Sequence, residues 1–416
     1  MSSDHQSSQQ HSPPSDRQSL KILAILSALM AFASVSTDVY LPAMPAMGES
    51  LHADSGQVAW TLSGYLVGFS LGQLLWGPIG DRYGRKRPIV AGLLLFIIGS
   101  AGCALANDIG WMIGWRAVQA VGACANVVLA RAMVRDLYEG HRAAQMLSTL
   151  MSVMAVAPLL GPSIGSLILT LGSWRAIFWA LAVFGFITWL ALTLLPETLP
   201  AERRSQLPLS GALRRYGQLL AQRRIVAYIG AGGCFYGALY AYIAGTPFAY
   251  ISYYHVSPQV YGLLFGAGIV GIMLANGLNA RLVRRVGSDT LLRYGSWLGA
   301  SAACVVALDA WTQWGGLPGL VVPLFVFVGA TGLIIANSII GALNGYPHMA
   351  GAVSALVGAL QYGTGIFGSG LVGIFADGTP RPMAGVIVAF ALASALFATF
   401  AVVVAPPLPV QGSTTL

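Results

Sequence analysis

Residues 77–86 of this chain read GPIGDRYGRK, a charged and glycine-rich run between two long apolar segments. The apolar segments, residues 56–79 and 88–106, are each long enough to cross roughly 30 Å of hydrocarbon as a helix. The run itself concentrates one acidic and three basic side chains between Asp81 and Lys86. We therefore place it at a membrane surface, as the loop between two spanning helices.

The composition of the whole chain agrees with a membrane setting. Only 9% of its 416 residues are charged and 56% are apolar, so the chain lacks the polar surface of a water-soluble domain. Twelve apolar segments qualify as spanning helices. They run approximately over residues 20–42, 56–79, 88–106, 110–133, 143–170, 174–195, 225–250, 258–280, 290–309, 317–340, 350–375 and 382–405. The sequence therefore predicts an all-α integral membrane protein.

The distribution of positive charge predicts the orientation of these helices. With the amino terminus in the cytoplasm, every Lys and Arg falls on the cytoplasmic side except Arg116, Arg175 and Arg381. Such a bias sets topology, and it explains the net charge of +8 without a nucleic-acid partner, which would need a basic soluble domain. We expect both termini to be cytoplasmic.

The polar stretches divide the chain into two halves. We expect a disordered cytoplasmic tail over residues 1–19, a six-helix bundle over 20–196, a cytoplasmic linker over 197–224, a second six-helix bundle over 225–405 and a cytoplasmic tail over 406–416. Gly77, Asp81 and Arg85 recur at the same spacing as Gly277, Arg281 and Arg285, which favours a tandem repeat. Transporters built from internal repeats hold their site between the halves.

Asp38 is the one carboxylate that this reading places inside an apolar segment. It lies about seventeen residues into the first span, well within a bilayer at a rise of roughly 1.5 Å per residue. Intramembrane charges are costly and mark functional sites by default. Arg116, in the fourth span, is expected at comparable depth, with Gln119 one turn away completing a polar network.

Several motifs resemble those of a known family. Residues 77–86 look like the G-x-x-x-D-R-x-G-R-K signature of the major facilitator superfamily, and Arg116 to Gly122 resemble its fourth-helix motif, with Ala120 in place of the usual Gly. Residues 157–165, APLLGPSIG, resemble its fifth-helix antiporter motif. Residues 38–42, DVYLP, with residues 347–351, PHMAG, are similar to the Bcr/CflA subgroup of drug-proton antiporters. The resemblance implies two six-helix bundles related by a pseudo-two-fold axis.

The resemblance also implies roles for the motif residues. A conformational latch is expected from Gly77, Asp81, Arg82, Gly84, Arg85 and Asp136, with Asp136 as a partner for Arg85 and the helix starting near Met349 facing Asp81. An antiporter hinge is expected from Pro158, Gly161, Pro162 and Gly165. The alternatives are that the basic residues only enforce topology, and that the prolines only kink a helix for packing.

Asp38 and Arg116 are predicted to couple transport to protons. A direct ion pair would favour the charged carboxylate and burial would favour the neutral acid, so a carrier could cycle Asp38 between those environments. The alternative is a permanent buried ion pair that fixes helix packing.

Substrate contacts are predicted from aromatic and neutral polar side chains, a wider set that includes Tyr240, Tyr242 and Tyr362. The preferred residues are Asp38, Tyr65, Arg116, Gln119, Asn126, Tyr236 and Gln361. Such side chains suit uncharged or amphipathic guests. For each of them, a place in the core or against lipid is the alternative.

We therefore expect a monomeric secondary transporter of a bacterial inner membrane, with no cofactor. It would export small neutral or hydrophobic antimicrobials, of the bicyclomycin or chloramphenicol kind, in exchange for protons. The rival is a carrier of a small metabolite such as a sugar, amino acid or nucleoside on the same fold.

An ATP-driven pump is disfavoured because neither Lys21 nor Lys86 lies in a Walker loop. A membrane enzyme and a metal site are disfavoured because no cluster of catalytic or ligating side chains is visible.

Overall fold

A computed structural model describes residues 16–138, 140–205, 209–344, 346 and 349–404. Over these residues the chain is helical, and twelve of its helices are long and apolar enough to cross a membrane. The predicted all-α membrane fold is therefore confirmed.

The helices fall into two groups of six spans joined by a linker. The first group comprises α1 (Asp16–Asp38), α3 (Ser55–Tyr83), α4 (Lys86–Leu105), α5 (Ile109–Leu137), α6 (Gly140–Leu171) and α7 (Trp174–Leu192), with the short η1 (Leu41–Ala43) and α2 (Met44–Ser50) after α1. The linker holds η2 (Ala201–Arg203) and α8 (Leu209–Leu220). The second group comprises α9 (Arg223–Pro247), which continues into η3 (Phe248–Tyr253), then α10 (Pro258–Val286), α11 (Ser288–Thr312), α12 (Gly316–Leu343), α13 (Ala350–Ile374) and α14 (Arg381–Val404).

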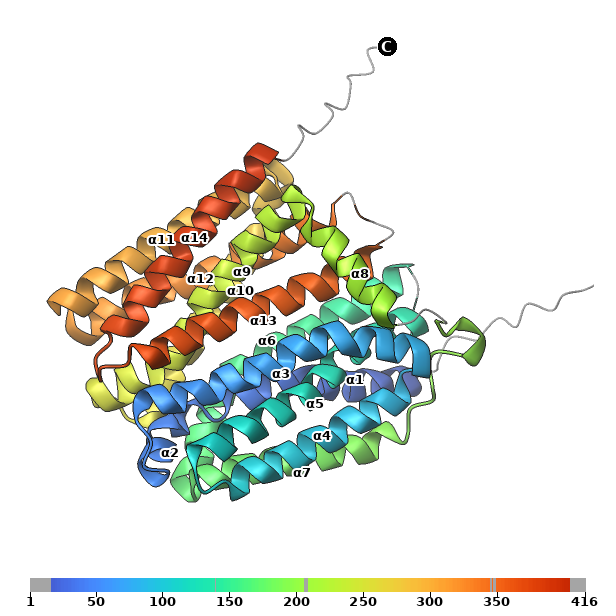
Figure 1. Ribbon diagram of the computed structural model, residues 1–416, viewed down its shortest axis with the longest axis horizontal. Helices are drawn as coiled ribbons and strands as arrows, with labels where there is room; N and C mark the ends of the chain where they lie inside the picture. The colour runs from blue at the N-terminus through green and yellow to red at the C-terminus, as the bar shows by residue number, and fades with distance from the viewer. Residues whose placement is uncertain (1–15, 139, 206–208, 345, 347–348, 405–416) are drawn as a thin grey trace, which may run out of the picture.

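The two groups form two bundles side by side, with α8 crossing from one to the other at one end (Figure 1). We call the end of the molecule next to α8 the linker face and the other end the opposite face. Large apolar side chains are exposed around the outside of both bundles. This is the pattern of a protein whose surrounding solvent is lipid.

The two halves repeat the same structural plan, but in a different register from the one predicted. Helices α3 and α10 each span 29 residues and each ends at a glycine with positive φ, +89° at Gly84 and +85° at Gly287. The start and the end of α10 therefore each lie 203 positions after the start and the end of α3, as Gly287 lies after Gly84. The predicted pairing of Gly77 with Gly277 is wrong by three residues, because the helix ends and not the scattered charges set the register.

The halves are in contact at the opposite face. There the hydroxyls of Ser63 in α3 and Ser369 in α13 lie 2.8 Å apart, and Gln259 of α10 donates to the Thr170 hydroxyl of α6 at 2.9 Å. Nearer the linker face, Ser70 donates to the carbonyl of Ala359 at 2.8 Å, so α3 and α13 stay together over most of their length.

Helices α6 and α10, one from each half, approach each other closely near the opposite face. Their close approach runs from Ser163 beside Gly262 to Leu159 beside Gly266. Beyond that point large apolar side chains of both helices are exposed. They are Met151 and Val156 on α6 and Met273, Leu274 and Leu278 on α10.

Candidate functional site

Asp38 is the last residue of α1, and the sequence explains why the helix ends there. The carbonyl of Asp38 would accept the N–H of residue 42 in a continuing helix, but that residue is Pro42, which has no N–H. The chain therefore leaves the α-helix and turns through η1 before α2 begins. The predicted first span, residues 20–42, is thus broken four residues before its end.

Two glycines of α6 allow this break to pack closely against the antiporter motif. A Cβ atom on Gly165 would lie 1.7 Å from the Val39 carbonyl oxygen, and one on Gly161 would lie 2.9 Å from the Asp38 Cβ. Pro158 and Pro162 both lie inside α6, which remains helical through them. The motif thus makes the close helix contact on which the position of Asp38 depends, and its action as a hinge stays a prediction.

Arg116 is fully buried on α5 and is held by neutral groups. Its Nη1 donates to the Ser36 carbonyl at 2.9 Å and to Gln119 Oε1 at 2.6 Å. Its guanidinium carbon lies 4.2 Å from the ring centroid of Tyr40 and 4.5 Å from that of Tyr65. Flat guanidinium groups stack well on aromatic faces, so the two rings stabilise this charge without a carboxylate.

Asp38 and Arg116 do not form an ion pair. Both salt bridges found among the described residues involve Arg85. Asp38 is 5% exposed, and its Oδ1 accepts one hydrogen bond, from the Thr37 hydroxyl at 3.1 Å. Nε and Nη2 of Arg116 have no partner. A permanent buried ion pair is therefore excluded as the role of these residues.

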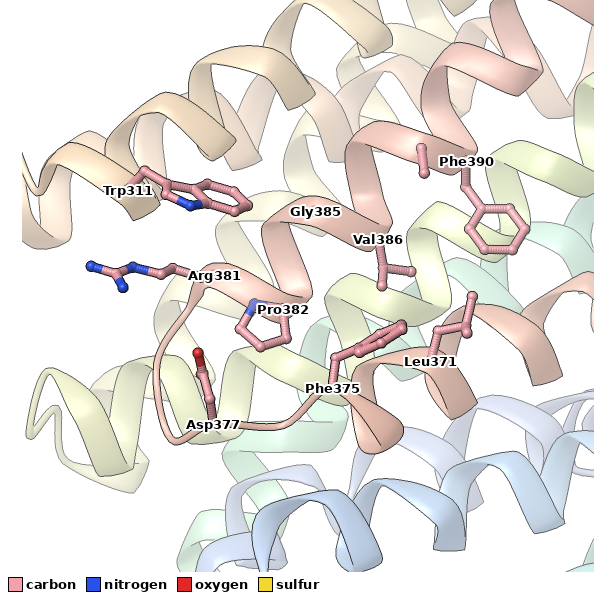
Figure 2. A pocket seen from close by; sticks show the side chains of 10 residues that line it. Trp311, Leu371, Phe375, Asp377, Arg381, Pro382, Gly385, Val386 and Phe390 are labelled. Carbon is pink, nitrogen blue, oxygen red and sulfur yellow. The ribbon is translucent and has the colours of Figure 1, made fainter.

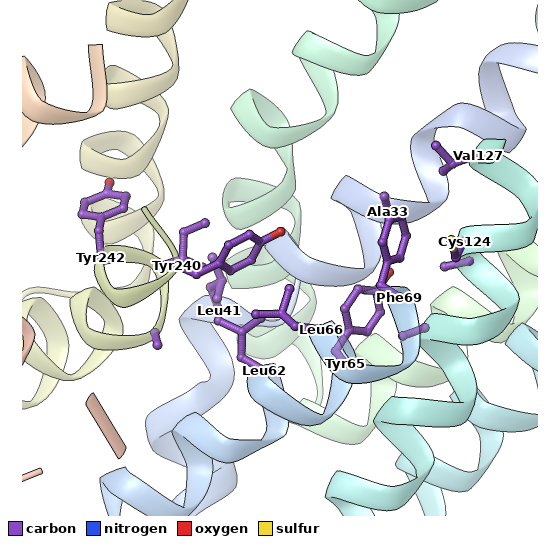
Figure 3. Close-up of a cluster of buried hydrophobic side chains, with 14 of the residues drawn as sticks. Ala33, Leu41, Leu62, Tyr65, Leu66, Phe69, Cys124, Val127, Tyr240 and Tyr242 are labelled. Carbon is purple, nitrogen blue, oxygen red and sulfur yellow. The ribbon is translucent and has the colours of Figure 1, made fainter. Parts of the chain in front are cut away.

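A cavity of about 200 Å³ lies between the halves, with Asp38 in its wall. Tyrosines from both halves surround it: Tyr65 from α3, Tyr236, Tyr240 and Tyr242 from α9, and Tyr362 from α13. The rings of Tyr236 and Tyr362 meet edge to face with centroids 5.6 Å apart. Tyr240 reaches from the second half toward Leu66 and Tyr65 of the first (Figure 3). The cavity is thus an aromatic chamber with one carboxyl group.

The cavity brings together only part of the predicted set of substrate contacts. Asp38, Tyr65 and Tyr236 line it. Arg116 and Gln119 lie outside the lining, and Gln119 also donates to the Ser100 hydroxyl at 2.8 Å.

Asn126 and Gln361 are buried and also lie outside the cavity lining. Oδ1 and Nδ2 of Asn126 and Nε2 of Gln361 have no hydrogen-bond partner. Their roles as substrate contacts stay predictions. Sequence reasoning missed Phe265 and Thr331, which also line the cavity and carry no motif or intramembrane charge that could have marked them.

The cavity is connected to Arg116 through one tyrosine. The hydroxyl of Tyr65 lies 2.7 Å from the Ser36 hydroxyl, and the Ser36 carbonyl accepts from Arg116. The ring of Tyr65 faces the guanidinium at the same time. A guest that moves Tyr65 therefore changes the surroundings of Arg116 directly.

The latch residues gather at the linker face around Arg85. Its Nη1 lies 2.6 Å from Asp81 Oδ1 and its Nε 2.8 Å from Asp136 Oδ2, which is the pairing expected for Asp136. Burial works against the charge of Arg85, but the hydrogen bonds that it donates to these two carboxylates, together with their negative charge, outweigh burial and raise the pKa of the guanidinium.

The remaining latch residues do not reach the second half. Arg82 lies over the ring of the neighbouring Tyr83, and a Cβ on Gly77 would meet nothing within 4 Å. Asp81 bonds to Arg85 of its own half and makes no hydrogen bond to the described start of α13. Asp81 and Met349 instead line a common cavity of about 350 Å³. Among the described residues, the hydrogen bonds and ion pairs of Asp81 and Arg85 therefore stay within the first half, and the role of this cluster as a latch stays a prediction.

Glu197 is a member of this cluster that sequence reasoning missed. Its carboxylate accepts the backbone N–H groups of Arg85 at 2.8 Å and Lys86 at 3.1 Å, at the start of α4, and also those of Thr198 and Leu199. Burial raises the pKa of Glu197, but these four backbone donors lower it by more, so the pKa lies below its usual value. A Cβ on Gly84 would lie 2.6 Å from Glu197 Oε2, so Gly84 is needed for space as well as for its positive φ.

A second buried acid corrects the prediction that Asp38 is alone within the apolar segments. Asp309 is the last residue of the predicted span 290–309, but α11 continues past it to Thr312, and Asp309 is 2% exposed. Asp309 Oδ1 accepts the N–H of Gly315 at 2.7 Å, which ties the helix to the turn that follows. Asp309 lies at the opposite face, outside the cavity lining. Within the described residues no group of three or more His, Cys, Asp or Glu side chains could hold a metal ion.

Two six-helix halves around a central cavity define a carrier of the alternating-access type. The chain belongs to the Major Facilitator Superfamily, whose family model matches residues 25–369. The predicted resemblance and the prediction of a membrane transporter rather than an enzyme are both confirmed.

Three bacterial relatives cover most of the chain. It is 33% identical to an MFS-type transporter of Bacillus subtilis over 92% of this chain and 96% of that one. It is 32% identical to the bicyclomycin resistance protein homolog of Haemophilus influenzae over 87% and 90% of the two chains. It is 31% identical to the chloramphenicol resistance protein of Pseudomonas aeruginosa over 80% and 78%.

Solved structures share the fold at low sequence identity. The nucleoside transporter NupG matches with a TM-score of 0.73 at 14% identity, covering 92% of this chain and 98% of that one. A partially occluded inward-open form of the xylose transporter XylE from Escherichia coli matches with a TM-score of 0.72 at 16% identity, covering 95% and 99%. These likenesses show the fold alone.

Proposed function

We propose that this protein exports small neutral or hydrophobic antimicrobials in exchange for protons. The observation that carries the proposal is Asp38, a buried carboxyl without an ionic partner in the wall of an aromatic cavity between the two halves. Relatives named for resistance to bicyclomycin and chloramphenicol support the choice of cargo.

The shape and chemistry of the cavity support a small guest without strong positive charge. Its volume of about 200 Å³ is below the range of drug-sized sites, roughly 300–1,000 Å³. The lining offers tyrosine rings for stacking and hydroxyls for hydrogen bonds, but a single acid. A strongly cationic cargo would require more carboxylates than Asp38 alone.

Coupling would follow from how water reaches Asp38. When water enters the cavity the carboxylate is stabilised by solvation, and when water is excluded the neutral acid is favoured. Cargo and proton would then use the site in turn as the halves rock around it. Arg116 would respond to this cycle through Tyr65, which lines the cavity, and through Ser36, which contacts both Tyr65 and Arg116.

We also propose that the linker face is cytoplasmic and that the protein works as a monomer in the bacterial inner membrane. The basic residues support this orientation: Arg82, Lys86 and the arginines of α8 lie at the linker face, whereas Arg175 and Arg381 begin α7 and α14 at the opposite face. An excess of Lys and Arg marks the cytoplasmic side.

The proposal is tested by Asp38→Asn in proteoliposomes with chloramphenicol as the probe. Under an imposed proton gradient we expect proton-driven chloramphenicol transport to fall at least tenfold, because the amide has no titratable proton. Asp309→Asn is the matched control, since it changes a second buried acid outside the cavity and should keep wild-type transport. Full uphill transport by Asp38→Asn would refute the proposal.

The same vesicles distinguish export from the uptake of a metabolite. If protons entering a vesicle drive the probe out, the protein is an antiporter. If sugars, amino acids or nucleosides move together with the protons, the metabolite carrier is the correct assignment.

A further inference from the structure

A second cavity lies in the second half and shares no lining residue with the central chamber (Figure 2). It has a volume of about 510 Å³ and lies between α11, α13 and α14. Its lining is apolar along most of its length, from Trp311 and Pro382 to Phe375 and Phe390. Because Phe375 is 60% exposed and Trp311 53% exposed, the protein alone does not fill this groove.

The length of the groove matches one leaflet of a bilayer. It follows α14 from Arg381 at the start of the helix to Phe390. At 1.5 Å per residue this is roughly 13 Å, close to half of the ~30 Å hydrocarbon core. Since α14 begins at the opposite face, the groove would lie within the outer leaflet, with Arg381 at the level of the headgroups.

Arg381 is an unpaired cation at the mouth of the groove. Its backbone N–H bonds to the Thr379 hydroxyl, and no hydrogen bond, salt bridge or stacked ring engages its guanidinium within the described residues. Asp377 also lines the groove at this end, and its Oδ1 accepts the Thr379 N–H at 2.8 Å and the Thr379 hydroxyl at 2.7 Å.

The other basic residue at this face provides a contrast. Arg175 donates to the Ala106 carbonyl at 3.1 Å and lies over the Trp174 ring at 4.2 Å. Its guanidinium is therefore already satisfied by the protein. Of these two arginines, Arg381 is the one whose guanidinium is left to bind an anion supplied from outside.

We propose that the groove binds one phospholipid of the outer leaflet, with an acyl chain along the apolar floor and the phosphate at Arg381. Arg binds phosphate through paired N–H groups, and aromatic rings such as Trp311 are typical of the headgroup level. Arg381 matches the charge of the phosphate, and the apolar groove matches the length of an acyl chain in one leaflet.

The structure offers variants that separate the two parts of the site. Arg381→Gln removes the charge at the mouth. Gly385→Leu fills the floor, because a Cβ on Gly385 would already lie 3.4 Å from Trp311 Cη2. Gly114→Leu is the matched control, since Gly114 is exposed near the same face of the first half and a Cβ there would meet nothing within 4 Å.

The test is native mass spectrometry of the purified, delipidated full chain titrated with phosphatidylglycerol. We expect one tightly bound lipid for the wild type and for Gly114→Leu. Arg381→Gln should weaken binding about fivefold, the effect of one basic residue near an anionic lipid, and Gly385→Leu should abolish the tight site. Diacylglycerol with the same chains should bind the wild type about as weakly as phosphatidylglycerol binds Arg381→Gln.

Three results would overturn the proposal. One is tight phosphatidylglycerol binding that survives Gly385→Leu. Another is equal affinity for diacylglycerol and phosphatidylglycerol, since the phosphate would then play no part. The third is competitive displacement of the lipid by chloramphenicol, which would make the groove a cargo portal. If Gly385→Leu does not fold, as judged by its melting curve, Arg381→Gln and the diacylglycerol comparison decide the question without it.

Discussion

At the scale of single residues, Arg116 is the least expected feature of the site. A fully buried guanidinium without a carboxylate partner is costly unless other groups compensate for its lost hydration. Here the compensation comes from the faces of Tyr40 and Tyr65, from the Ser36 carbonyl and from Gln119. Because the charge does not depend on Asp38, Asp38 can gain or lose a proton while Arg116 stays in place.

This arrangement predicts that Arg116→Lys is not conservative. Lysine keeps the charge, but its ammonium lacks the flat surface that stacks on the rings of Tyr40 and Tyr65. We expect proton-driven transport to fall at least tenfold in vesicles with matched protein levels. Arg175→Lys at the opposite face, where the side chain is only partly buried, is the control and should transport normally. Equal activity of the two variants would contradict the role of the tyrosine faces.

At the scale of helices, the antiporter motif determines where α1 ends in space. Gly165 leaves no room for a side chain, because its Cβ would lie 1.7 Å from the Val39 carbonyl oxygen. The break at Pro42 and this contact together hold Asp38 in the cavity wall. The motif therefore has a packing role at Asp38 itself.

Gly165→Ala should consequently displace α1 or destabilise the fold. The added methyl group overlaps backbone, which has no freedom to move aside, so we expect a loss of about 1–3 kcal/mol, as for other overpacked sites. The thermal midpoint of the purified protein measures it. Gly277→Ala on α10, where a Cβ would meet nothing within 4 Å, should leave the midpoint within a degree or two. A Gly165→Ala midpoint equal to that of Gly277→Ala would show that the contact is loose.

Glu197, which accepts hydrogen bonds from the start of α4, should make the stability of the protein depend on pH. Glu197 has its pKa lowered in the folded protein, chiefly because the effect of its four backbone donors exceeds that of burial. Because the pKa of Glu197 is lower in the folded protein than in the unfolded chain, its carboxylate stabilises the fold at pH values above the ordinary pKa of 4.5. This stabilisation is lost as the pH falls through the pKa of the folded protein. The melting temperature of the wild type should therefore drop more steeply below pH 4.5 than that of Glu197→Gln. The difference should be small, because the side chain is exposed to solvent.

The control for this pH effect is Glu202→Gln, which changes an exposed acid in η2 of the same linker. It should follow the wild-type curve over the whole range. Parallel curves for the wild type and Glu197→Gln would show that Glu197 does not stabilise the start of α4.

At the scale of the whole molecule, the halves meet near the opposite face, where Ser63 of α3 contacts Ser369 of α13 and Ser163 of α6 lies beside Gly262 of α10. At the linker face, Asp81 of the first half and Met349 of the second half line a common cavity of about 350 Å³. Alternating access would require the contact between Ser63 and Ser369 to break in each cycle.

A disulfide at this contact should therefore stop transport. With the four native cysteines replaced, Ser63→Cys with Ser369→Cys places two sulfurs where hydroxyls now lie 2.8 Å apart. We expect oxidation to lower transport at least tenfold and a reductant to restore it. The Ser63→Cys single variant should not respond to oxidation. Undiminished transport by the crosslinked protein would show that this face does not need to open.

Much of the fold could be predicted because hydrophobic runs are local. The spans followed from the apolar segments, and the partner of Arg85 followed from the loop signature and Asp136. The register of the repeat could not be predicted from scattered charges, since it is the helix ends at Gly84 and Gly287 that define it. Glu197 was missed for a similar reason, because the linker showed no sign that its first residue folds back on α4.

The sequence by itself determined the membrane class, the twelve spans and the presence of Asp38 and Arg116 within them, because burial of apolar segments in lipid depends on composition over short stretches. Only the tertiary structure decided that these two charges are unpaired, that tyrosines from both halves enclose the cavity and that Arg381 stands free above an apolar groove. Those facts depend on how each helix is rotated and which helix it packs against, and contacts between residues far apart in the chain decide both.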